Sequence, residues 1–161
     1  LEKLNCSYVI IGHSERRENH FETDELINSK VKNVLSKKLN PIVCVGESYE
    51  DRKSGHYKKT LRNQLEKSIP SKCKEIIIAY EPIWSIGTGQ IPSVKEIIEI
   101  QNITIDFLNK SKEINNVYFL YGGSVNAKNL GDIIKSTNID GALIGGASLK
   151  IQEMQKILTL C

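Results

Sequence analysis

Five short apolar runs recur along the chain, and each is rich in β-branched or aromatic side chains. They are apolar throughout, which is typical of strands that are buried on both faces of a parallel sheet. We therefore predict five strands, at residues 8–12, 42–46, 76–80, 117–121 and 142–145.

Helical patterns fill the segments between these strands. An apolar stripe predicts helices over about 24–39 and over 57–69. Ser93 followed by Glu96 forms a capping-box pattern, which predicts the start of a third and longer helix. Shorter helices are expected from about Ala127 and Leu149. Since strand and helix alternate without any hairpin signal, we predict an α/β fold with a parallel sheet and a single domain over 1–161.

Polar or glycine-rich residues follow every predicted strand, before the next helix begins. In parallel α/β folds the carboxyl ends of the strands point to one face, and that face holds the site. We therefore expect the chemistry of this chain to gather on one side, at residues 12–15, 46–48, 81–82, 122–124 and 145–148.

The last two strands are each followed by a glycine pair, at 122–123 and at 145–146. Such pairs let backbone amides approach a ligand closely, and a helix that follows directly adds its positive N-terminal end. Together they predict a phosphate cradle, in the position where barrels often bind phosphate. The alternative is two tight turns in which glycine is needed only for a positive φ.

Glu81 stands at the end of a strand and directly precedes Pro82. A carboxylate that is partly desolvated has a raised pKa and is a good general base, whereas in an open loop it would be a solvated surface group. Residues 82–92 have proline at both ends and glycine in the middle, which is typical of a hinged lid that excludes water. His13 lies between a strand and a helix start, where neighbouring amides favour a neutral imidazole that can donate to a carbonyl. The alternative is a structural, hydrogen-bonded histidine.

Composition narrows the function classes. The 161 residues carry a net charge of +3 with both signs interspersed, so they lack the basic surface of a nucleic-acid binder. We expect no transmembrane segment and no signal peptide. The four cysteines have no close pairing, which argues against a zinc site or a redox pair and suits a reducing cytosol. We therefore expect a cytoplasmic protein without a metal or a cofactor.

Five segments resemble the successive signatures of the triosephosphate isomerase family, in the same order and spacing. They are YVIIGHSERR at 8–17, PIVCVGE at 41–47, AYEPIWSIGTG at 79–89, YGGSVN at 121–126 and DGALIGGASL at 140–149. The resemblance implies a (β/α)₈ barrel of which strands four to eight are present. It also implies that strands one to three, with a lysine that contacts the substrate, are missing from this chain.

The resemblance further implies a role for each matching residue. Glu81 would be the base and His13 the neutral electrophile in the interconversion of dihydroxyacetone phosphate and D-glyceraldehyde 3-phosphate, which is the established mechanism of the family itself. Glu15 would be a supporting acid. The phosphate would be held by backbone amides at Gly87, Ser124, Gly145 and Gly146.

The family context adds three expectations and leaves two alternatives open. It implies glycolysis and gluconeogenesis as the setting, a triose phosphate as the small-molecule partner, and a homodimer for the full-length protein. The chain departs from the family pattern at Ser85, where alanine is frequent, and at Gln90, where lysine is frequent. One alternative is an inactive truncated fragment that retains at most phosphate binding. An enzyme from another phosphate-binding barrel is a more distant one.

Overall fold

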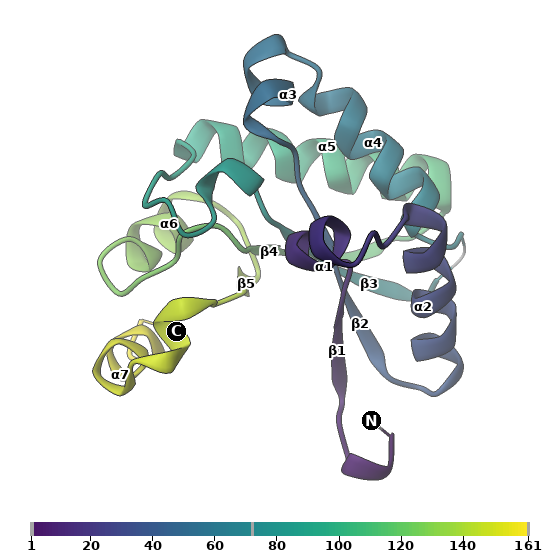
Figure 1. The fold of residues 1–161 in the computed structure, drawn as a ribbon, viewed down its shortest axis with the longest axis horizontal. Coiled ribbons are helices and arrows are strands. Elements are labelled where there is room, and N and C mark those ends of the chain that lie inside the picture. Colours follow the sequence, from purple (N-terminus) through teal and green to yellow (C-terminus); the bar gives the residue numbers. More distant parts are fainter. Residues whose placement is uncertain (1, 72, 161) are drawn as a thin grey trace.

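The computed structural model describes residues 2–71 and 73–160 and contains one parallel sheet. Its strands lie side by side in the order in which they occur in the chain (Figure 1). The registers place Ile10 beside Ile42, Val43 beside Ile78 and Leu120 beside Gly141. The five predicted strands are thereby confirmed as β1(Tyr8–Ile11), β2(Asn40–Val45), β3(Glu75–Tyr80), β4(Asn116–Tyr121) and β5(Gly141–Ala142).

Helices follow the strands along the chain (Figure 1). The helices over 24–36, 57–68 and 94–112 pack against the sheet, where they contact β1, β2 and β4. The predicted helices over 24–39 and 57–69 are confirmed, and the third begins as expected, since Ser93 and Glu96 form a complete capping box. The helices are α1(Ser14–Asn19), α2(Asp24–Ser36), α3(Tyr49–Ser54), α4(Tyr57–Ser68), α5(Val94–Lys112), α6(Leu130–Ser136) and α7(Ile151–Leu158), with 3₁₀ turns at Glu2–Leu4, Ile83–Ser85 and Gly146–Leu149.

The C-terminal elements differ from the prediction in their bounds. The strand expected over 142–145 pairs only at Gly141–Ala142, and the helix expected from about Ala127 begins at Leu130, after a turn. Leu149 lies in a 3₁₀ turn, and α7 begins two residues later. Helix α3 was not predicted. It is only six residues long, too short for an apolar stripe to appear in the sequence.

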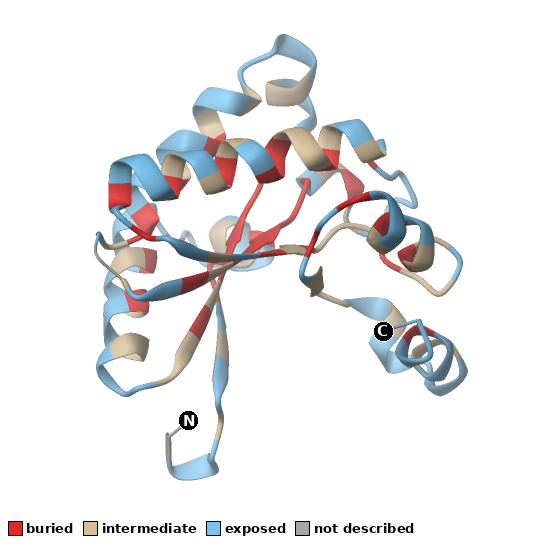
Figure 2. Cartoon of the chain, turned by 180° about the vertical axis from the view of Figure 1, so that it is seen from behind, coloured by how far each residue is buried: buried red, intermediate tan, exposed pale blue. Residues whose placement is uncertain are grey.

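The core lies between the helices and the sheet, where the buried residues gather (Figure 2). From the helices it contains Ile27, Val31, Leu61, Leu65, Ile97, Ile100 and Leu108, and from the strands Val43, Val45, Ile76, Ile78 and Phe119. The first strand departs from our expectation of burial on both faces. Ile10 is 50% exposed. Among the described residues β1 pairs with β2 alone, so one edge of β1 has no neighbouring strand to cover it.

None of the helices in the part of the chain that the structure describes is long and apolar enough to cross a membrane. Cys44 on β2 is buried, whereas Cys6 and Cys73 are half-buried thiols. The fourth cysteine, Cys161, lies outside the described residues.

Candidate active site

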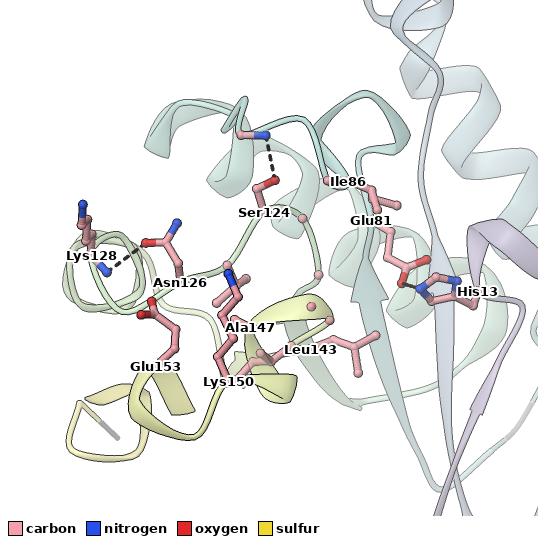
Figure 3. Close-up of a pocket in the computed structure, with 18 of the residues that line it drawn as sticks. His13, Glu81, Ile86, Ser124, Asn126, Lys128, Leu143, Ala147, Lys150 and Glu153 are labelled. Atoms are coloured by element: carbon pink, nitrogen blue, oxygen red, sulfur yellow. Dashed lines mark hydrogen bonds and ion pairs between the residues drawn. The ribbon is translucent and has the colours of Figure 1, made fainter. Parts of the chain in front are cut away.

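A cavity of about 580 Å³ opens at the carboxyl ends of the strands (Figure 3). Its walls come from the ends of β1, β3, β4 and β5 and from the loops that follow them. Six of the seven residues that the sequence singled out line this cavity, namely His13, Glu81, Gly87, Ser124, Gly145 and Gly146. The seventh, Glu15, lies outside the lining in α1 and is exposed, although its backbone amide contacts His13.

Glu81 is held at the end of β3 by its backbone and its side chain. Its N–H donates to the carbonyl of Val45 on the neighbouring strand at 2.8 Å. Its carboxylate is only 2% exposed and accepts the N–H of Ser14 at 3.2 Å. Burial raises the pKa of Glu81, while His13, the Ser14 amide, Cys44 and Arg17 act to lower it. The alternative of a solvated loop carboxylate is therefore wrong, and the burial matches that of a general base.

His13 precedes α1 and faces Glu81 (Figure 3). Its Nδ1 accepts the backbone N–H of Glu15 at 3.3 Å, and its Nε2 lies 3.1 Å from Glu81 Oε1. Because an acceptor nitrogen carries no proton, these partners assign the proton to Nε2, which donates to the carboxylate. In this arrangement the Nε2–H of His13 and the carboxylate of Glu81 lie side by side in the lining of the cavity.

The segment 82–92 covers one side of the cavity, and we call it the lid. Gly87 and Gly89 have φ angles of 68° and 79°, a region that glycine adopts without strain. The Gly89 N–H donates to Ser124 Oγ at 3.3 Å, which connects the lid to the turn after β4. Near its other end, Trp84 Nε1 donates to Glu47 Oε1 at 3.1 Å. Hydrogen bonds therefore hold the lid near both ends, while its glycines allow backbone conformations that other residues rarely adopt.

Glu47 anchors the base of the lid from inside the protein. It is fully buried, and its Oε1 accepts the hydroxyl of Tyr80 at 2.9 Å as well as the indole N–H of Trp84. Burial raises the pKa of Glu47, and the two hydrogen bonds and the charge of Arg52 oppose that shift. No pattern in the sequence indicated this role, because it depends on groups from four separate segments.

The two glycine pairs serve different purposes. None of the four glycines in these pairs has a positive φ. The alternative, two tight turns in which glycine is needed only for a positive φ, is therefore wrong. A Cβ on Gly123 would lie 2.2 Å from the Tyr121 hydroxyl, whereas on Gly145 or Gly146 it would meet nothing within 4 Å. The first pair permits close packing, and the second lines the cavity with open space beside it.

We predicted a helix directly after each glycine pair, and a helical turn starts directly only at the pair Gly145 and Gly146. A 3₁₀ turn begins at Gly146, while α6 begins several residues after Gly123. Two lysines that line the cavity, Lys128 and Lys150, were not predicted from the sequence. The signal that could have found them is their position, since each follows a glycine pair closely. In the described ranges 2–71 and 73–160, no group of three His, Cys, Asp or Glu residues is placed to hold a metal.

Comparisons with known proteins agree with this geometry. A family model for triosephosphate isomerase matches residues 1–161. The triosephosphate isomerase of Saccharopolyspora erythraea is 44% identical over 164 residues, which cover 98% of this chain and 63% of that protein. That of Francisella tularensis subsp. holarctica is 42% identical, with 98% and 65% covered. The crystal structure of triosephosphate isomerase from Bartonella henselae has a TM-score of 0.88 at 35% identity, covering 99% of this chain and 67% of that one.

The chain therefore spans 63% to 65% of the length of these two curated relatives. Within that span the likeness is continuous, since the solved structure covers nearly the whole chain and the family model covers all of it. Its sheet of five parallel strands fits part of a barrel of this family. By sequence and by structure, the chain belongs to the triosephosphate isomerase family.

Proposed function

We propose that this chain carries the base, the electrophile and the phosphate cradle of an isomerase that interconverts dihydroxyacetone phosphate and D-glyceraldehyde 3-phosphate. The observation that carries the proposal is the pairing of a buried carboxylate with an imidazole N–H at 3.1 Å, inside a cavity lined by Gly145 and Gly146. An aldose–ketose isomerisation needs a base beside the carbon that loses its proton. It also needs a donor beside the oxygen that gains charge.

In this proposal Glu81 takes the proton from the carbon next to the carbonyl. The raised pKa of its carboxylate supports the role, because a base with a pKa nearer to neutrality gains more from accepting a proton. His13 polarises the carbonyl through Nε2–H and moves protons between the two oxygens of the enediolate. Glu15 supports the site through its backbone amide, which holds Nδ1 of the imidazole in the acceptor state.

The phosphate would lie against the amides of Gly87, Ser124, Gly145 and Gly146. These residues line the same cavity as the base, and the open space beside the second glycine pair admits an anion close to the backbone. Backbone N–H groups and the start of a helical turn favour a phosphate group. The lid would exclude water and keep the enediolate from losing its phosphate.

The whole protein's context follows from the family alone. We propose a cytoplasmic homodimer in glycolysis and gluconeogenesis, with the substrate a free triose phosphate and no cofactor. We also propose a single barrel domain to which this chain contributes strands four to eight. Three further strands, one with a substrate-contacting lysine, would complete it.

The alternative is an inactive fragment that retains at most phosphate binding. On β1, Tyr8 is more than half exposed and Ile10 is half exposed. Among the described residues, β1 has one neighbouring strand. An unpaired, apolar strand edge is a liability that closed barrels remove. A chain in this form would keep the phosphate cradle while its base and electrophile lacked the charge of the family's lysine.

The test is a coupled assay of glyceraldehyde 3-phosphate isomerisation on the 161-residue chain. Glu81→Asp shortens the base by one methylene, and we expect a loss of about 10²-fold or more in kcat. Glu75→Asp is the matched control, because Glu75 begins the same strand at its far end and is exposed. Activity that only the first variant lowers would support the isomerase. A folded chain with phosphate binding and no activity would support the inactive fragment instead.

A further inference from the structure

The side chain of Ser85 lies at the junction of the lid and the turn after β4. It is fully buried, at the end of the 3₁₀ turn Ile83–Ser85. Its hydroxyl donates to the carbonyl of Gln90 at 2.5 Å, near the far end of the lid. The same oxygen accepts the backbone N–H of Ser124 at 3.2 Å and lies 3.3 Å from the hydroxyl of Tyr121. One small side chain thus touches the lid, the turn and strand β4.

These contacts use the full capacity of a hydroxyl, which donates once and accepts twice. The single proton of Ser85 is directed to Gln90, so Tyr121 must be the donor in the remaining pair. The surroundings are equally tight, since a Cβ on Gly123 would lie 2.8 Å from Ser85 Oγ. The hydroxyl therefore has a defined position and cannot turn away without leaving a buried group unpaired.

One of these partners also belongs to the proposed phosphate cradle. The Ser124 amide is among the donors that would face the phosphate, yet in this structure it donates to Ser85 Oγ. Substrate phosphate and the Ser85 hydroxyl would therefore need the same N–H.

We propose that Ser85 is a positioning residue that competes with the phosphate group for the Ser124 amide and so weakens phosphate binding. The inference rests on the proposed function, because it assumes the same cradle. Binding a phosphate would break the Ser124–Ser85 bond and, through the shared hydroxyl, loosen the contact with Gln90 at the end of the lid. Ser85 thereby couples occupation of the cradle to the position of the lid.

The test measures the affinity of the 161-residue chain for inorganic phosphate and for glycerol 3-phosphate by titration calorimetry. Ser85→Ala removes the competing hydroxyl, and we expect both anions to bind about two- to tenfold more tightly, the value of one ordinary hydrogen bond. A merely structural role would instead weaken binding. Ser85→Cys conserves most of the volume with a weaker acceptor, and tightening is expected there too if the alanine variant fails to fold.

Thr88→Ala is the matched control. It removes another hydroxyl of the lid, which donates to the carbonyls of Trp84 and Ser85, but leaves the Ser124 amide bonded to Ser85 Oγ, so phosphate binding should not tighten. Trp84 is the only tryptophan of the chain, and its fluorescence reports the lid in every variant. Equal or weaker affinity in both Ser85 variants, with phosphate still bound by the unchanged chain, would overturn this inference alone. Absence of binding in every variant would overturn the cradle itself and the inference with it.

Discussion

Gly46 and Glu81 approach each other so closely that a Cβ on the glycine would lie 1.7 Å from the carbonyl oxygen of the glutamate. The two residues directly follow the neighbouring strands β2 and β3, and the N–H of Glu81 donates to the carbonyl of Val45, the residue before Gly46. The side chain of Gln64 on α4 bonds both the N–H and the carbonyl of Gly46, each at 2.9 Å. A helix and a glycine together therefore fix the backbone that carries the candidate base.

Gly46→Ala should destabilise the fold by about 3 kcal/mol or more, because the new methyl group meets backbone atoms that cannot rotate away. Urea unfolding followed by circular dichroism would measure the change. Gly131→Ala is the control, since its Cβ would be in ordinary contact with Leu160 and it lies within α6. That substitution should be neutral or stabilise by up to about 1 kcal/mol. Equal effects of the two substitutions would contradict the close approach.

The pKa of Glu81 has a consequence for stability. Burial raises it above the ordinary value of 4.5, so the folded chain binds this proton more tightly than the unfolded chain does. The contribution of Glu81 to the free energy of unfolding is therefore fully present below its ordinary pKa, and it is lost as the pH rises through the raised pKa. The Glu81→Gln variant has no carboxyl group to ionise, so its stability should not fall with pH in this way. We expect the unfolding midpoint of the variant to rise relative to that of the unchanged chain as the pH increases from about 4 upward.

Thermal unfolding of both proteins over a series of pH values would measure this difference. The groups that face Glu81 are His13, Cys44 and Arg17, and all three remain in the variant. Glu75→Gln serves as the control, because Glu75 is exposed at the other end of β3. Parallel midpoints for Glu81→Gln and the unchanged chain across the acid range would contradict the raised pKa.

Much of this architecture follows from short-range patterns. The apolar runs predicted all five strands, and the Ser93 and Glu96 pair marked the start of α5, because both signals depend on residues close in sequence. Five residues of the candidate site were found for a related reason: they follow strands, and parallel strands bring their carboxyl ends together. Gly87, in the lid, was assigned only from the resemblance to the family. Glu81 could thus be selected before its burial was known.

Other features depend on contacts between distant segments and left no pattern to find. The bond between Trp84 and Glu47 joins residues 37 positions apart, and that between Ser85 and the Ser124 amide spans 39. The exposure of Ile10 depends on what lies beside β1, which the composition of the strand does not encode. The different purposes of the two glycine pairs also arise from their neighbours in space, chiefly Tyr121.

His13 should influence the titration of Glu81 directly. The histidine acts to lower the pKa of that carboxyl, so His13→Ala should move it further upward. The carboxyl ¹³C shift of Glu81, followed against pH by NMR, would measure the change. In an active chain the same substitution should also lower kcat by about 10² to 10⁴-fold, the usual contribution of one acid–base group.

His56→Ala is the matched control for this experiment, since His56 is an exposed histidine that contacts Ser54 and lies outside the cavity. It should leave both the titration of Glu81 and the activity unchanged. A Glu81 titration that is identical in the His13 variant and the unchanged chain would show that the two side chains do not interact in solution.

The two glycine pairs offer a final test that separates packing from binding. Gly146→Ala places a methyl group in open space on a residue that lines the cavity, so the free energy of unfolding should change by less than about 0.5 kcal/mol. Phosphate affinity should nevertheless fall, because the methyl group stands where the anion approaches the backbone. Gly123→Ala should do the reverse and destabilise by about 1–3 kcal/mol, since its Cβ would overlap the Tyr121 hydroxyl. Titration calorimetry and urea unfolding on both variants would measure the contrast. If Gly146→Ala bound phosphate as tightly as the unchanged chain, the second glycine pair would have no part in the cradle.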